Sequence, residues 1–116
     1  MLIDANVILR YLLNDHIKMS EEERQVIAQG AFTLPEVLAE VVYVLGGIYQ
    51  VEREEIAKTL MDFLEEVSID CQEVMYEALS IFSNTALDFV DCILIARHRV
   101  LGEMVKSFDK KLNKML

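Results

Sequence analysis

The sequence has few cysteines, few basic residues and no long apolar run. Its two cysteines, Cys71 and Cys92, show no spacing typical of a disulfide or a zinc site, so we expect reduced thiols in a core. No uninterrupted apolar stretch approaches the roughly 20 residues of a membrane-spanning helix. Nothing at the start resembles a signal peptide, because Asp4 and Arg10 interrupt the apolar residues. These absences predict a cytoplasmic protein without a membrane partner.

Basic residues are outnumbered by acidic ones. Eleven lysines and arginines against twenty acids give a net charge of −9. Because phosphate contacts need lysine and arginine, this balance argues against a protein that holds nucleic acid by general electrostatics alone. A nucleic-acid enzyme of this composition would need divalent cations, a local basic rim or both, and a basic partner peptide is an alternative. The length of 116 residues and the hydrophobic content of 53% predict one domain, residues 1–116, with a proper core.

Short apolar strands alternate with amphipathic helices along the chain. We expect strands over residues 1–3, 31–34, 68–70 and 104–108, of which the third is short and at an edge. We expect helices over residues 7–13, 20–30, 35–45, 51–67, 73–82 and 87–102. The helix at 35–45 is apolar on nearly every face, which predicts that it is buried on most sides. Alternation of this kind predicts an α/β fold with a parallel sheet and right-handed crossovers.

Several carboxylates occupy positions where chemistry is common. Asp4 and Asp109 follow apolar strands directly, and open parallel sheets bind their ligands at that edge. Glu40 and Asp91 interrupt apolar helices, where an unpaired buried carboxylate is costly. Simpler interpretations exist, with Asp4 as a helix cap and Glu40 on an exposed stripe. Asp88 shares a helix face with Asp91 and is most simply a cap.

The four acids Asp4, Glu40, Asp91 and Asp109 could meet at one point. If the first and last strands are neighbours, the two strand-end acids lie side by side, and helices that start from the same sheet edge can aim the other two at them. Carboxylates crowded together repel one another unless a cation neutralises them. Oxygen ligands suit Mg²⁺ or Mn²⁺, and no histidine or cysteine set suggests zinc. Such a site can position a water for attack on a phosphodiester.

Four stretches in a fixed order are spread along nearly the whole chain. They are IDANVILRYL at 3–12, LPEVLAEVVYVL at 34–45, LDFVDCILIA at 87–96 and SFDKKL at 107–112. Together they resemble the PIN-domain ribonucleases, and in particular the VapC-type toxins of toxin–antitoxin pairs. The resemblance implies a three-layer α/β/α sandwich around a central parallel sheet of four to five strands. It also implies Mg²⁺- or Mn²⁺-dependent hydrolysis of RNA by an endoribonuclease.

The resemblance assigns roles to individual residues. The catalytic and metal-binding acids are Asp4, Glu40, Asp91 and Asp109, and the first and third of these lie closest to the metal. Three further residues would support these acids. Asn6 would hold water or a carboxylate, Ser107 would support the last acid, and Asp88 would lie outside the direct ligands of the metal. The candidates for RNA contact are Arg10, Arg97, Arg99, Lys110, Lys111 and Lys114. For any one of these basic residues, solubilising surface charge is the simpler interpretation.

Partners also follow from the resemblance. It implies a homodimer that a cognate antitoxin protein blocks by inserting a segment near the acids. The sequence departs from the family pattern in three ways. The loop after the first helix is short, and the net charge is more acidic than an RNA binder prefers. The chain also stops soon after Asp109, where the family usually has a last strand, so we expect a reduced sheet edge.

Two other functions stay open at this point. A catalytically inactive PIN-like domain that serves as a protein-interaction module would fit the acidic surface and the six methionines. A phosphotransfer domain with an aspartyl-phosphate also places acids at strand ends. It needs an aspartate after a central strand near the middle of the chain, and Asp70 does not follow a convincing one. Metal affinity separates the inactive module from the nuclease.

Overall fold

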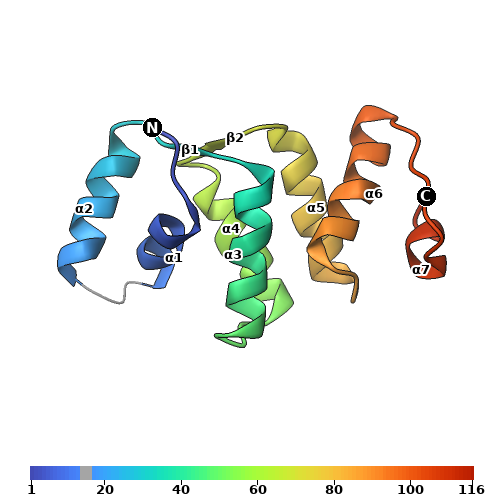
Figure 1. Ribbon diagram of the computed structural model, residues 1–116, viewed down its shortest axis with the longest axis horizontal. Coiled ribbons are helices and arrows are strands. Elements are labelled where there is room, and N and C mark those ends of the chain that lie inside the picture. Colours follow the sequence, from blue (N-terminus) through green and yellow to red (C-terminus); the bar gives the residue numbers. More distant parts are fainter. Residues whose placement is uncertain (14–16) are drawn as a thin grey trace.

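Helices account for most of the regular structure. The computed structural model describes residues 1–13 and 17–116, and the short loop expected after the first helix lies at 14–16, outside the described residues. The elements are α1 (Ala5–Leu13), α2 (Ile17–Ala28), β1 (Phe32–Thr33), α3 (Pro35–Gly47), α4 (Arg53–Phe63), β2 (Ser68–Ile69), α5 (Gln72–Asn84), α6 (Phe89–Leu101) and α7 (Lys110–Asn113) (Figure 1). The molecule is elongated, with principal extents of 46 × 27 × 18 Å.

A small parallel sheet lies at one side of the helices. β1 pairs with β2 in parallel, and Leu2 adds a parallel bridge to Phe32. The buried Thr33 reinforces this bridge, because its Oγ1 donates a hydrogen bond to the carbonyl oxygen of Ile3 at 3.1 Å. The predicted α/β character and parallel pairing are therefore present. The predicted sheet of four to five strands is not seen in the described residues, where two strands and one bridge form the sheet.

The prediction of a strand over residues 104–108 is wrong. α6 ends at Gly102 as expected, with a φ of 71° that favours glycine. The next residue, Glu103, is held against α6, because its carboxylate pairs with Arg97 and its carbonyl oxygen accepts a hydrogen bond from Nδ1 of His98 at 2.8 Å. These contacts direct the chain along α6 toward α7, so it does not cross to the sheet.

Amphipathic periodicity located α4, whereas α7 was not expected from the sequence. The helix expected over 51–67 is α4, and it buries Ile56, Leu60 and Phe63 as the pattern predicted. It ends at Phe63 rather than at residue 67, because the chain must turn before β2 begins. The start expected at Ser20 is wrong by three residues, since α2 extends one turn upstream to Ile17.

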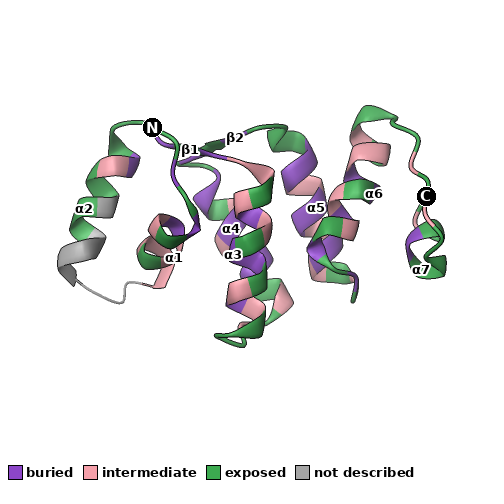
Figure 2. Cartoon of the chain, viewed as in Figure 1, coloured by how far each residue is buried: buried purple, intermediate pink, exposed green. Residues whose placement is uncertain are grey.

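The core lies where the helices face one another and the sheet. Figure 2 shows buried residues on the facing sides of α3, α4, α5 and α6. The largest fully buried side chains include Ile8, Leu38, Ile56, Leu60, Leu64, Met75, Leu79, Ile95 and Leu112. α5 packs between α4 and α6. Within residues 1–13 and 17–116, none of the helices has the length and apolar character needed to cross a bilayer.

Candidate functional site

Two carboxylates stand at the start of α6. Asp88 is the N-cap residue, and its carbonyl oxygen accepts a hydrogen bond from the amide of Cys92 at 3.0 Å. Its side chain makes no capping hydrogen bond, so this exposed carboxylate is available to a ligand. Asp91 lies in the first turn and is half-buried. The partial positive charge of a helix N-terminus stabilises negative groups at such positions.

Asp91 also lies within electrostatic reach of two other acids. Burial raises the pKa of the Asp91 carboxyl above its ordinary value, and the negative charges of Asp88 and Asp109 raise it further. The structure therefore brings Asp88, Asp91 and Asp109 into one neighbourhood. A cation bound there would relieve the repulsion among them.

Asp109 caps the last helix. Its Oδ1 accepts a hydrogen bond from the amide of Leu112 at 3.0 Å, and its own amide donates to Oγ of Ser107 at 3.0 Å. The carbonyl oxygen of Ser107 accepts a hydrogen bond from Nδ2 of Asn113 at 2.9 Å. Ser107 thus contacts the backbone of the last acid rather than its carboxylate.

Asp4 lies apart from these three acids. Its Oδ1 accepts a hydrogen bond from the amide of Val7 at 3.0 Å, which is the capping role that the simpler interpretation gave it. Asn6 is exposed in the first turn of the same helix. Figure 1 shows α1 well separated from α6 and α7. The expected meeting of Asp4 with Asp109 is absent because residues 104–108 do not pair beside the first segment.

Glu40 lies on the exposed side of α3. That helix buries Leu38, Val41, Val42 and Leu45, while Glu36, Glu40, Tyr43 and Gly47 form a stripe along the opposite face. The expectation that this helix is buried on most sides is therefore wrong. The sheet covers too little of α3 for that, and the exposed-stripe interpretation of Glu40 holds. A carboxylate in this position carries no burial penalty and needs no partner.

The acids at the start of α6 offer the carboxylate oxygens that a hard divalent ion prefers as ligands. Across the described residues, no three side chains of histidine, cysteine, aspartate or glutamate gather closely enough to hold a metal. Mg²⁺, however, is commonly bound through one or two carboxylates, with waters and substrate phosphates completing its shell. Asp88 and Asp91 supply that number, and both side chains carry only oxygen ligands. The residues present therefore fit a magnesium-like ion, with Asp109 close enough to influence it.

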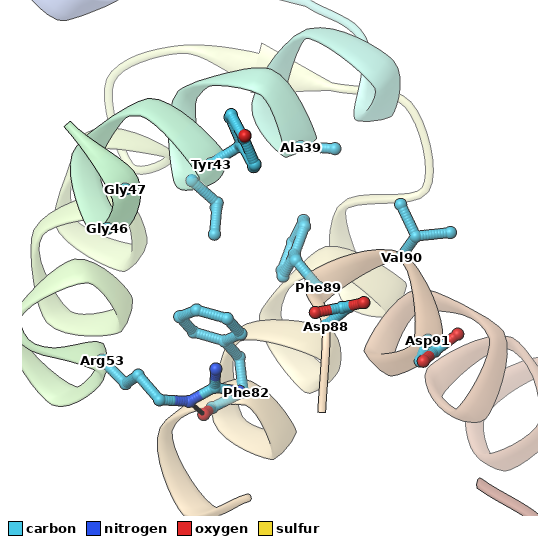
Figure 3. A pocket seen from close by; sticks show the side chains of 11 residues that line it. Ala39, Tyr43, Gly46, Gly47, Arg53, Phe82, Asp88, Phe89, Val90 and Asp91 are labelled. Atoms are coloured by element: carbon cyan, nitrogen blue, oxygen red, sulfur yellow. Dashed lines mark hydrogen bonds between the residues drawn. The ribbon is translucent and has the colours of Figure 1, made fainter. Parts of the chain in front are cut away.

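Asp88 and Asp91 also border a cavity of about 670 Å³. Figure 3 shows these two acids at the start of α6, with Tyr43 of α3 on the opposite side. Gly46 and Gly47 leave the α3 wall open, because they have no side chains. The lining thus combines apolar side chains with the two acids and the guanidinium of Arg53.

Arg53 is a residue of this site that the sequence patterns did not identify. Its Nε donates a hydrogen bond to the carbonyl oxygen of Phe82 at 2.9 Å, and its Nη2 donates to the carbonyl oxygen of Leu87. Its guanidinium carbon lies 3.6 Å from the centre of the Phe82 ring. These bonds fix the turn that precedes Asp88. The available signal was a single arginine within the acidic run 52–55.

The basic residues divide into two groups. Arg97 pairs with Glu103, and Arg99 contacts Glu77 and the carbonyl oxygen of Met115, so both are already engaged within the chain. Three lysines are exposed on or beside α7, next to Asp109: Lys110, Lys111 and Lys114. Two of them line a smaller cavity with residues 85–87, the segment just before Asp88. A local basic rim therefore adjoins the acids.

Comparison with known proteins adds an independent finding. The family model described as "PIN domain" matches residues 1–115. A VapC ribonuclease from Aquifex aeolicus (strain VF5) is 26% identical over 122 residues, which cover 98% of this chain and 90% of that protein. No solved structure matches the chain.

Proposed function

This chain belongs to the PIN domain family, and we propose that it is a metal-dependent endoribonuclease, the toxin of a toxin–antitoxin pair acting in the cytoplasm. One observation carries the proposal: Asp88 and Asp91 border one cavity at the start of α6, Asp109 lies within electrostatic reach of Asp91, and exposed lysines flank Asp109. The similarity to a VapC ribonuclease along nearly the whole chain supports the same activity.

Each part of this site has a role in phosphodiester hydrolysis. Asp91 and Asp88 would hold Mg²⁺ or Mn²⁺ through their carboxylate oxygens, and the ion would supply charge neutralisation of the scissile phosphate and a lower pKa for an attacking water. Lys110, Lys111 and Lys114 attract the RNA backbone, which supplies locally the positive charge that the chain lacks overall.

The remaining acids complete the proposed site. We expect Asp109 to stabilise the ion from a position next to Asp91, and Asp4 and Glu40 to contribute once RNA is bound. Asn6 and Ser107 are expected to hold the backbone near Asp4 and Asp109 in place. An antitoxin segment with a basic side chain would block this acidic end, and a homodimer is the expected assembly.

Cleavage of RNA tests the proposal directly. A mixed single-stranded RNA pool is incubated with the protein in Mg²⁺, in Mn²⁺ or in EDTA, and the fragments are separated on a gel. Wild type should cut only with a divalent ion, and Asp91→Asn should lose at least about tenfold in rate, since removing one good metal ligand typically costs that much or more.

A matched variant separates a specific loss from a general one. Asp62→Asn makes the same chemical change at an exposed aspartate of α4, far along the chain from the acids of α6, and should cut like wild type. Calorimetry with Mn²⁺ gives a second measure, in which Asp91→Asn binds more weakly than Asp62→Asn. If wild type neither cuts RNA nor binds Mn²⁺, the nuclease proposal fails and the inactive interaction module takes its place.

A further inference from the structure

The cavity beside the acids of α6 is lined largely by apolar and aromatic side chains. Its volume of about 670 Å³ is in the range of sites that hold small molecules. Val42, Tyr43 and two glycines of α3 form one wall, and Phe82 of α5 and Phe89 of α6 contribute to the other (Figure 3). Tyr43 is 76% exposed, so its ring stands at the wall without being packed into the core. The cavity therefore offers an aromatic surface to a planar ligand.

Arg53 brings unused hydrogen-bond donors to this cavity. A guanidinium has five N–H groups, and within the described residues Arg53 donates two hydrogen bonds, from Nε and Nη2 to backbone carbonyl oxygens. Both N–H groups of Nη1 and one of Nη2 remain. No carboxylate in the described part of the chain forms an ion pair with this guanidinium. A half-buried cation with spare donors and no acidic partner is matched best by a ligand that presents acceptor atoms.

A row of contacts joins Arg53 to the acids. The guanidinium carbon of Arg53 lies 3.6 Å from the centre of the Phe82 ring, and that ring meets the Phe89 ring edge-on at a centroid distance of 5.8 Å. Phe89 is the first residue of α6, so it directly follows Asp88 and shares the first turn with Asp91. Figure 3 shows the same order, with Arg53 and Asp91 on opposite sides of the two phenylalanines. A nucleotide whose phosphate lies at an ion held by the acids can therefore extend its base toward Arg53.

The spare donors of Arg53 distinguish among the four bases. Guanine presents two neighbouring acceptors, O6 and N7, which a guanidinium binds through two parallel hydrogen bonds. Adenine has an amino group in place of O6, so a donor would face a donor, and the pyrimidines lack N7. An apolar side chain of a protein partner would fill the same space but leave the donors of Arg53 without acceptors, which is unfavourable. The chemistry of the wall therefore favours guanine.

We propose that this cavity is a guanine subsite, in which the base of a nucleotide that flanks the scissile phosphate lies against Tyr43 and accepts hydrogen bonds from Arg53. The two backbone bonds of Arg53 hold its guanidinium in one orientation, so its remaining donors are directed before the base arrives. The place of the subsite next to the cleaved bond rests on the proposed nuclease function, while base binding rests on the cavity alone. The subsite would direct cleavage to positions beside guanine.

Binding in EDTA tests the subsite without cleavage. Fluorescein-labelled pentanucleotides carry one central guanine, adenine, cytosine or uracil between uridines, and their affinity for the protein is measured by fluorescence anisotropy. The acids repel all four phosphate backbones alike, so a difference in affinity reports on the central base. The guanine oligonucleotide should bind at least about fivefold more tightly than the adenine one, as expected for a bidentate contact from arginine. Equal affinities for the four oligonucleotides would overturn the proposal.

Substitutions at the walls assign the preference to the cavity. Tyr43→Ala should weaken binding of the guanine oligonucleotide about fivefold or more through lost stacking, and Tyr43→Phe should restore it. Tyr49→Ala is the matched control, because this half-exposed tyrosine is not among the residues that line the cavity, and it should bind like wild type. Arg53→Lys keeps the charge but not the fork, so it should lose the preference for guanine. Unchanged binding in Tyr43→Ala, or an Arg53→Lys variant that folds by circular dichroism and still prefers guanine, would refute the assignment.

Filling the cavity tests the subsite without removing a contact. A Cβ atom at Gly47 would meet nothing within 4 Å outside its own stretch of α3, and leucine favours a helix more than glycine does, so Gly47→Leu should fold. Its side chain would occupy the space proposed for the base. The preference for guanine should therefore disappear, while Mn²⁺ binding measured by calorimetry stays as in wild type. A Gly47→Leu variant that still prefers guanine would contradict the proposal.

Cleavage mapping separates the subsite from the proposed function. In Mg²⁺, wild type should cut a mixed RNA pool mainly beside guanine, and Gly47→Leu should cut without that preference. If wild type binds the guanine oligonucleotide selectively but cuts no RNA, the nuclease function fails and the subsite stands. If wild type cuts RNA while the four oligonucleotides bind alike, the nuclease stands and the subsite is refuted, as it would be if a protein partner filled the cavity.

Discussion

Replacing Arg53 by methionine should lower the free energy of unfolding by about 3.5 kcal/mol. Arg53 donates two hydrogen bonds to the carbonyl oxygens of Phe82 and Leu87, and its guanidinium lies over the Phe82 ring. A charge-assisted hydrogen bond contributes about 1.5 to 3 kcal/mol, and the lower value applies because this side chain is only half-buried. The ring contact adds about 0.5 kcal/mol. Methionine keeps much of the aliphatic stem, so the loss reports mainly on the guanidinium.

The assay is urea denaturation followed by circular dichroism, with the denaturant slope compared between variants. Lys58→Met is the matched control, because it removes an exposed cation from the same helix and should change stability by less than about 0.5 kcal/mol. Arg53→Lys should recover only part of the loss, since one ammonium cannot reproduce two hydrogen bonds in fixed directions. If Arg53→Met and Lys58→Met cost the same, the argument that Arg53 fixes the turn before Asp88 is refuted.

Three further results are expected from the described contacts. The pKa of Asp91 is raised above its ordinary value of 3.8, so just above that pH the folded protein binds more protons than the unfolded chain. Ionisation of Asp91 therefore lowers the free energy of unfolding as the pH rises. Urea denaturation in EDTA should find Asp91→Asn more stable than wild type at pH 7 but not at pH 3. Thiol titration with a disulfide reagent at pH 8 should label the exposed Cys71 in the folded protein and Cys92 only after unfolding, because Cys92 is fully buried and burial raises the pKa of its thiol to about 11; rapid labelling of both would contradict its burial. Leu112→Ala should lower the free energy of unfolding by about 2 kcal/mol, the low end for a buried leucine, because a four-residue helix can undock. Proteolysis of this variant should then cut first near residues 103–109, and an unchanged digestion pattern would argue against the docking of α7.

Local patterns in the sequence predicted local contacts well. The cap at Asp4 joins a carboxylate to an amide three residues later, so a short stretch of sequence contains the whole interaction. Gly102 ended α6 for the same reason, since one residue's φ decides it. The spacing of Asp88 and Asp91 on one helix also placed them together correctly.

Such local patterns did not predict contacts between residues that are far apart in the sequence. Arg53 bonds to residues 29 and 34 positions away, and no periodicity in α4 indicates where that side chain reaches. The face of α3 that carries Glu40 was ambiguous, because an apolar helix shows no clear stripe until its neighbours are known. Asp4 and Asp109 each follow an apolar segment, but which segments pair depends on what else holds them.

The sequence by itself determined helices α1 to α6, the cap at Asp4, the stop at Gly102, the α/β class and the acids worth testing. Most of these depend on residues within one or two turns of one another. Only the tertiary structure decided that Asp109 lies within electrostatic reach of Asp91, and that Asp4 lies apart from these acids. The physical reason lies in residues 103–112. The ion pair of Glu103 with Arg97 and the burial of Leu112 hold that stretch against α6, and those contacts outweigh the β-propensity of residues 104–108.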